Sequence, residues 1–183
     1  TFARKMETPK ARAQYMWYND EMPYTLENSI RADIAGQVLD MIYLKKIREE
    51  ASAAYSVSAI GRAQLREDKT HSMMLYAICP MKPEKRQEAV SILEQEVKDL
   101  ANTCDASMVT KIKELMLKQA DDAVKSNGYW YNVIEMYDKY GIDSHSDYKK
   151  LIEAQTPETI CSFMKEFNKN GNRLGVIMLP AEK

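Results

Sequence analysis

The stretch IREEASAAYSV, Ile47–Val57, contains the change from helical to alternating spacing on which the fold depends. Upstream of it, apolar residues recur every three or four positions, which predicts a helix with one buried stripe that ends near residues 48–51. The members of this stripe are Leu26, Ile30, Ile34, Val38, Met41, Ile42 and Ile47. Downstream, AAYSVSAIGRAQ (residues 53–64) alternates, which predicts a strand with Tyr55, Val57 and Ala59 on one face.

Several other stretches are typical of strands. KARAQYMWYND (10–20) alternates, with Ala11, Ala13, Tyr15 and Trp17 expected on a buried face. REDK (66–69) is expected to form a hairpin tip, and THSMMLYAICP (70–80) the strand that returns from it. RLGVIMLP (173–180) is apolar throughout and predicts a strand in the centre of the sheet. FARKME, near the N-terminus, is expected to precede the first strand or to pair with it.

The remaining segments carry helix signals. Pro83 suits the first turn of one helix, Asp105 the N-cap of the next, and Gly141 the end of a third. Thr156 followed by Pro157 predicts the start of a last helix. The order is thus strand, helix, two antiparallel strands, several helices, strand. It predicts an α+β fold, a two-layer sandwich of a mostly antiparallel sheet with helices packed on one face, and residues 1–183 as a single domain.

The composition excludes several classes of protein. The chain of 183 residues has 26 basic and 27 acidic side chains, a balance that argues against a dedicated nucleic-acid-binding protein. No apolar run approaches the ~18 residues that a membrane span needs, and TFARKMETPK lacks the apolar core of a signal peptide. Because it also lacks an initiator Met, we expect the sequence to be part of a longer chain. The scattered Cys79, Cys104 and Cys161 are expected to be small buried or half-buried apolar residues rather than a disulfide framework or a zinc site.

Motifs for metal binding and catalysis are absent from the sequence. The two histidines, His71 and His145, have no partner at HExxH or HxxEH spacing, so neither is expected to be a metal ligand. No nucleophile elbow and no glycine-rich phosphate loop occurs. The aromatic run Tyr129–Tyr131 could stack a ligand, but a cluster that is part core and part rim is the simpler reading.

Arg48 and Tyr55 are the candidates for chemistry, and two readings of them stay open. In the structural reading, Arg48 complements the helix dipole and Tyr55 is simply a good strand former. In the functional reading, the helix-to-strand junction brings a guanidinium and a phenol together to bind a peptide carbonyl and to steady the charge that develops on its oxygen. The pair would supply neither a base nor a nucleophile.

At this junction, LKKIREEASAAYSVSA (44–59) resembles the C-terminal domains of insulinase-like zinc peptidases, also called pitrilysin-like peptidases or inverzincins. The resemblance continues through residues 76–100, 127–143 and 156–180, and so covers most of the chain from Ala11 onward. It implies the α/β sandwich expected above. Family members commonly have Gly where Ser52 stands, so the turn there is expected to have a different shape.

The resemblance also implies a division of labour. The family's N-terminal domain carries HxxEH and a distal Glu, which hold zinc and activate water. Its C-terminal half supplies an Arg and a Tyr, which assigns substrate-backbone binding to Arg48, and substrate binding with transition-state stabilisation to Tyr55. No HxxEH occurs in this chain, which is expected to hold no cofactor of its own and to be inactive alone.

The expected partners are therefore a peptide substrate and a zinc-bearing N-terminal domain or partner subunit. The resemblance fits a periplasmic or cell-envelope bacterial parent. The alternative is a non-catalytic structural or assembly subunit on the same fold, because some relatives have lost proteolysis.

Overall fold

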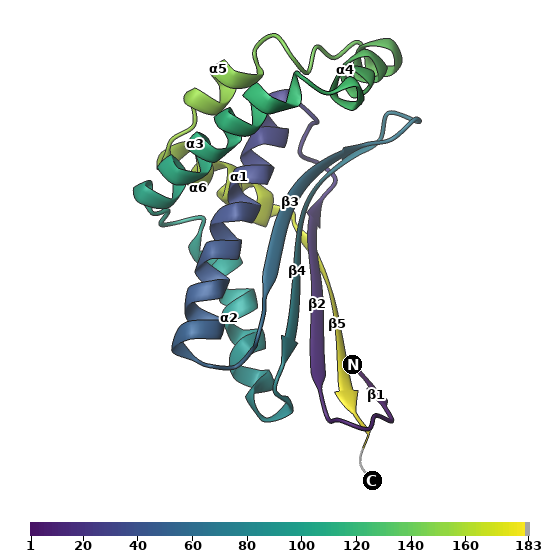
Figure 1. Cartoon of the computed structure of the whole chain (residues 1–183). Helices are drawn as coiled ribbons and strands as arrows, with labels where there is room; N and C mark the ends of the chain where they lie inside the picture. The colour runs from purple at the N-terminus through teal and green to yellow at the C-terminus, as the bar shows by residue number, and fades with distance from the viewer. Residues whose placement is uncertain (182–183) are drawn as a thin grey trace.

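One curved sheet forms the base of the molecule. The structure is a computed structural model that describes residues 1–181. Within this range, five strands lie in the order β1-β5-β2-β4-β3 (Figure 1). They are β1 (Phe2–Arg4), β2 (Ala11–Asn19), β3 (Ser58–Leu65), β4 (His71–Met81) and β5 (Asn172–Pro180). Only the β1–β5 pair is parallel, so the expected mostly antiparallel sheet is confirmed.

The helices cover one face of this sheet, and the opposite face carries none of them (Figure 1). They are α1 (Leu26–Tyr43), a π-helical segment η1 (Leu44–Glu50), a 3₁₀ turn η2 (Pro83–Lys85), α2 (Arg86–Asp99), α3 (Ala106–Ala123), α4 (Asn127–Tyr140), α5 (Tyr148–Glu153) and α6 (Pro157–Lys169). The expected α+β two-layer architecture is therefore confirmed. No helix within residues 1–181 is both long and apolar enough to cross a membrane.

The alternation predicted for β2 places its inner residues in the core. Ala11, Ala13, Tyr15 and Trp17 are all buried, and the rings of Tyr15 and Trp17 stack with their centroids 5.3 Å apart. Burying side chains of this size stabilises the fold by about 1.5–3 kcal/mol for each large apolar residue. β2 thus contributes to the face on which α6 packs, while α2 packs on the neighbouring strand β4.

The predicted helix ends are confirmed where side chains cap the backbone. The Asp105 carboxylate accepts a hydrogen bond from the Ser107 N–H, and Thr156 forms a reciprocal capping box with Thr159. Gly141 closes α4 in the left-handed conformation, with φ of 68°. These local contacts satisfy N–H and C=O groups that would otherwise remain unpaired at the helix ends.

Helix α1 lies directly on the backbone of β3. A Cβ atom at Gly36 would overlap the backbone of Ile60 and Gly61, and one at Gly61 would overlap the carbonyl oxygen of Ala32. The two glycines therefore allow a helix-to-strand approach that a side chain would prevent. This contact fixes the direction of α1 on the sheet, and with it the position of η1, which continues α1.

The prediction that residues 173–180 form a central strand is wrong for most of its length. β5 lies between β1 and β2, but β1 pairs only with Met178–Pro180. The three-residue β1 thus leaves the outer edge of residues 172–177 unpaired within the described chain, and Leu174 is 55% exposed. FARKME precedes β2, the strand that was expected to be first. It contains β1, which pairs with β5 rather than with β2.

The cysteines behave as the sequence predicts. All three are free, with Cys79 buried and Cys104 and Cys161 half-buried. Burial raises the pKa of the Cys79 thiol to about 11 and, as the largest cause, that of Cys104 to about 12. Such thiols stay protonated at neutral pH and are poor nucleophiles.

Candidate functional site

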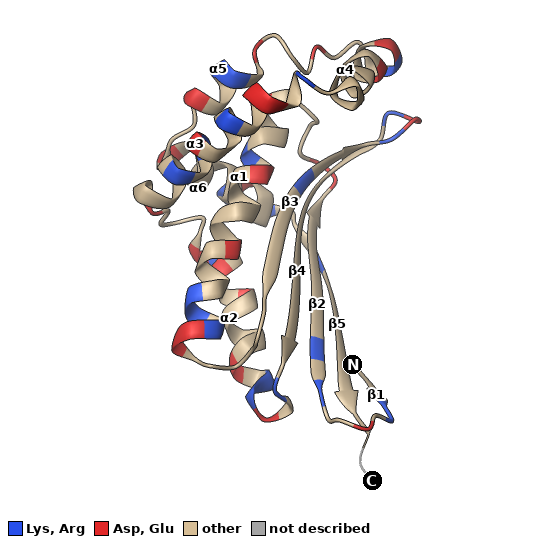
Figure 2. Cartoon of the chain, in the orientation of Figure 1, with Lys and Arg blue, Asp and Glu red and all other residues tan. Residues whose placement is uncertain are grey.

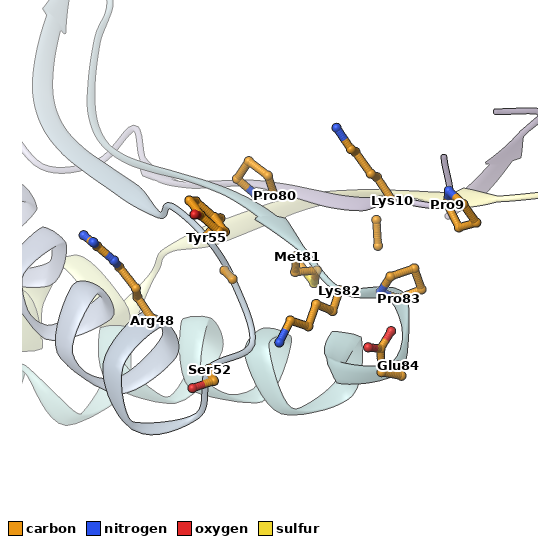
Figure 3. Close-up of a pocket in the computed structure, with 12 residues that line it drawn as sticks. Pro9, Lys10, Arg48, Ser52, Tyr55, Pro80, Met81, Lys82, Pro83 and Glu84 are labelled. Carbon is orange, nitrogen blue, oxygen red and sulfur yellow. The ribbon is translucent and has the colours of Figure 1, made fainter. Parts of the chain in front are cut away.

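An open groove lies at the end of the sheet, beside the segment that connects α1 through η1 to β3. Its volume is about 780 Å³, and three chain segments line it: residues 9–11 at the start of β2, the connection between η1 and β3, and residues 80–84 at the end of β4 (Figure 3). The β2–β4 register pairs Ala11 with Met81, which brings the first and third segments together. Both candidate residues, Arg48 and Tyr55, belong to this lining.

The π-helical segment η1 positions Arg48. It continues α1 with wider turns, and its buried side is held by Ile47 in the core. The Tyr43 hydroxyl donates to the Leu93 carbonyl oxygen (2.8 Å), and the Lys46 ammonium pairs with the buried Glu96 carboxylate (2.6 Å). Both contacts tie this part of the chain to α2, so Arg48 is left on the exposed side. Wide helical turns of this kind occur frequently at functional sites.

Ser52 then reverses the chain in a conformation that glycine prefers. Its φ of 49° is left-handed, which is uncommon for a residue with a side chain. The next residue is fixed from both sides: the Ala53 N–H donates to the Ile47 carbonyl (2.9 Å), and the Ala53 carbonyl accepts from the Lys82 N–H (3.0 Å). The serine at this position thus adopts a backbone conformation that glycine favours.

The predicted strand position of Tyr55 is wrong. Regular pairing of β3 begins only at Ser58, and before it the Ala54–Met81 bridge is the one β-contact of the connection within the described residues. Without a continuous ladder the alternation is not enforced. Tyr55 is therefore 95% exposed, whereas Val57, which was expected on the same face, is buried.

Arg48 and Tyr55 nevertheless line the same groove, and Figure 3 shows Arg48 on η1 and Tyr55 on the connection from η1 to β3. Within residues 1–181, no ion pair engages the Arg48 guanidinium and no hydrogen bond engages the Tyr55 hydroxyl, so both groups are free to contact a ligand. Arg48 also stands in the last turn of η1, where a cation suits the helix dipole. The geometry is compatible with both readings of the pair.

Other candidate positions do not form a site. In the part of the chain that the structure describes, no group of three or more His, Cys, Asp or Glu side chains could hold a metal ion. His145 is engaged instead by the Tyr129 hydroxyl, 2.7 Å from its Nδ1. The expectation that residues 129–131 are partly core is wrong, because α4 buries none of its side chains and Tyr131 is largely exposed.

Sequence reasoning missed three charged residues of the groove: Lys10, Lys82 and Glu84. No local pattern distinguishes them from ordinary surface residues. They line the same groove as Arg48 because the β2–β4 pairing and the Ser52 turn bring distant parts of the chain to one place.

The fold of this chain was compared with those of known proteins. No family model matches the sequence, and no curated protein matches it. Among solved structures, the periplasmic protease PqqL from Escherichia coli matches with a TM-score of 0.80 and 20% identity, over 99% of this chain and 20% of that one. The peptidase M16 inactive domain from Pseudomonas fluorescens matches with a TM-score of 0.70 and 11% identity, over 98% of this chain and 43% of that one.

A third structure, the inactive peptidase domain of a Bordetella parapertussis protein described as a zinc protease, matches with a TM-score of 0.72 and 10% identity. Here the match covers 98% of this chain and 96% of the other, whereas this chain spans only about a fifth of the length of PqqL. The architecture expected from the resemblance is thereby confirmed, and the chain has the fold of the inactive domains of insulinase-like (M16) zinc proteases.

Proposed function

We propose that the chain is a C-terminal, non-zinc domain of an insulinase-like metallopeptidase and that its groove holds the backbone of a peptide substrate. One observation carries the proposal: an exposed guanidinium and an exposed phenol, Arg48 and Tyr55, line the same open groove. The domain that bears them has the fold of zinc-protease domains.

The two groups have distinct roles in this proposal. The Arg48 guanidinium donates hydrogen bonds to a substrate carbonyl oxygen, and its permanent charge makes these bonds stronger than neutral ones. The Tyr55 hydroxyl donates to the oxygen on which negative charge develops during hydrolysis, a contact that lowers the barrier because it strengthens in the transition state. Neither group removes a proton from water or attacks the carbonyl carbon.

The attack on the peptide must come from another domain or chain. The described residues do not fit a zinc centre, and the sequence contains no HxxEH. This chain spans about a fifth of the length of PqqL. That share supports a zinc-bearing domain located elsewhere, in a longer parent chain or in a partner subunit. The description of PqqL as a periplasmic protease supports a periplasmic or cell-envelope parent.

The test is peptide hydrolysis by this chain together with its zinc-bearing half, in one polypeptide or as two subunits. Tyr55→Phe is expected to lower kcat about 10²–10³-fold, the usual effect of removing one oxyanion donor. Arg48→Ala is expected to lower kcat/KM about tenfold to a hundredfold, because hydrogen bonds to charged groups contribute about 1.5–3 kcal/mol.

Tyr131→Phe is the matched control, since Tyr131 is exposed on α4 and does not line the groove. The free energy of unfolding of all three variants should lie within about 0.5 kcal/mol of that of the natural chain, as is usual for surface substitutions. If turnover is unchanged in both Tyr55→Phe and Arg48→Ala, the proposed roles are wrong.

A second candidate function, a non-catalytic assembly module, is favoured by the uncovered face of the sheet. A shallow depression of about 450 Å³ lies there among exposed apolar side chains, including Ile60, Leu174 and Val176. Under this alternative, Val176→Lys would disrupt association with the partner domain, whereas Arg48→Ala would leave the function unchanged. The same pair of variants, assayed for assembly and for hydrolysis, therefore separates the two functions.

A further inference from the structure

The polar lining of the groove is mainly positive. Lys10, Arg48 and Lys82 are exposed on it, and Glu84 is the one carboxylate among its lining residues. Lys10 lies directly before β2, Arg48 in η1 and Lys82 in the β4–α2 connection, so the three cations come from separate stretches of the chain (Figure 3). The whole chain is nearly neutral, with 26 basic and 27 acidic residues, and the excess is therefore local.

Within residues 1–181, no ion pair joins these cations to the nearby carboxylates, of which Glu49, Glu50 and Glu84 are exposed. Glu88, on the nearest helix, is occupied by Lys85 at 2.7 Å. Figure 2 shows basic positions near the start of β2 and, together with acidic ones, at the turn from β4 into α2.

The β2–β4 pairing and the apolar lining of the groove explain how the cations can act on one ligand. The Ala11–Met81 pair ends the β2–β4 ladder, and Lys10 and Lys82 lie directly beyond it on the two strands. The lining of the groove also includes apolar residues, among them Pro9, Pro80 and Pro83. Charges beside apolar surface are less well screened than charges surrounded by water, so a ligand that supplies carboxylates gains more there.

We propose that the groove selects acidic polypeptide segments: an extended peptide whose Asp or Glu side chains meet Lys10 and Lys82 while its backbone lies beside Arg48 and Tyr55. The backbone contacts rest on the function proposed above, whereas the charge preference rests on the two lysines. Neutral peptides bind through the backbone contacts alone, and basic peptides are repelled.

The experiment measures binding of labelled peptides to the 183-residue chain by anisotropy. The probes are a neutral peptide and one of equal length in which every third residue is Glu, each at low and at physiological ionic strength. The natural chain should bind the acidic peptide about tenfold more tightly at low salt, and added salt should reduce the preference. Lys10→Glu/Lys82→Glu should abolish or reverse it, and Lys10→Arg/Lys82→Arg should retain it.

The matched control is Lys118→Glu/Lys165→Glu, which reverses two exposed lysines on α3 and α6, away from the groove. This variant has the same net charge as Lys10→Glu/Lys82→Glu, so it should keep the preference if the groove itself is responsible. Equal loss in the control would assign the preference to the overall field of the protein and overturn the proposal. Equal affinity of the natural chain for both peptides, or no binding of either, would overturn it too.

The outcome is independent of the catalytic proposal. If Arg48→Ala and Tyr55→Phe leave hydrolysis unchanged but the glutamate variants lose the acidic preference, the groove binds acidic peptides without the proposed catalytic role. If hydrolysis falls in the first pair and the lysine substitutions change nothing, the backbone contacts are right and the charge selectivity is wrong.

Discussion

The contact between α1 and β3 and the connection between the same two elements are built in opposite ways. At the contact, Gly36 and Gly61 bring two backbones together in the core, with no space for a Cβ atom. In the connection, a π-helical turn, a left-handed Ser52 and a single β-bridge leave Tyr55 in solvent. Regular structure thus holds the platform, and the irregular backbone presents the side chains that can meet a ligand.

The largest expected effect comes from Gly61→Ala. The new methyl group would overlap the Ala32 carbonyl oxygen, and because this obstacle is backbone, helix and strand must separate. We expect a loss of about 3 kcal/mol or more in the free energy of unfolding, or a Tm lower by roughly 6–12 °C, measured by denaturant and thermal unfolding.

Gly128→Ala is the control for this substitution. Gly128 lies in the first turn of α4, and its added Cβ would be 3.6 Å from the Ser126 hydroxyl oxygen, which is ordinary contact. Its stability should be unchanged or slightly higher. Equal stability of Gly61→Ala and Gly128→Ala would show that α1 and β3 are not in backbone contact, and the comparison above would fail.

The buried side of the sheet should also respond to alkaline pH. Burial, followed by a hydrogen bond to Glu94 and the charge of that carboxylate, raises the pKa of Tyr15 from 10.0 to about 12. The folded state therefore holds this proton more tightly than the unfolded state does. The stability that results is fully present below pH 10.0 and is lost as the pH rises towards about 12.

Urea unfolding at a series of pH values tests this. Tyr15→Phe is less stable at neutral pH because it loses the hydroxyl contact, but its stability should fall less steeply in the alkaline range. A slope identical to that of the natural chain would contradict the assignment to Tyr15.

Ser52 offers the smallest and most specific test. Ser52→Gly should be neutral or stabilise the fold by up to about 1 kcal/mol, because relief of the left-handed backbone competes with the greater freedom of glycine in the unfolded chain. Ser52→Val should destabilise by about 1–2 kcal/mol, since a β-branched residue tolerates positive φ poorly. Chemical denaturation measures both, and a variant order with Val more stable than Gly would refute the left-handed turn.

The sequence predicted what local chemistry and periodicity determine. The alternation of Ala11, Ala13, Tyr15 and Trp17 identified β2, and Asp105 marked a helix start because its carboxylate can replace a missing backbone partner. The architecture followed from the order of these elements, because a sheet with one apolar face requires helices to cover it.

Long-range placement was not predictable in the same way. The alternation of residues 53–64 resembles a continuous strand, but the bridge at Ala54 and the turn at Ser52 depend on Met81 and on η1. The apolar character of β5 likewise cannot reveal that its neighbour β1 has only three residues. Lys10 and Lys82 are seventy-two positions apart in the chain, and only the β2–β4 register makes them neighbours.

The two tryptophans differ in their exposure to solvent. Trp17 is buried and stacked on Tyr15, whereas Trp130 is 40% exposed on α4 with its indole N–H bonded to the Val124 carbonyl. Intrinsic emission should therefore have a blue-shifted and a red-shifted component. Replacing Trp17 would leave an optical reporter for the outermost helix, and replacing Trp130 would leave one for the core, so melting of the two layers could be followed separately without any added dye.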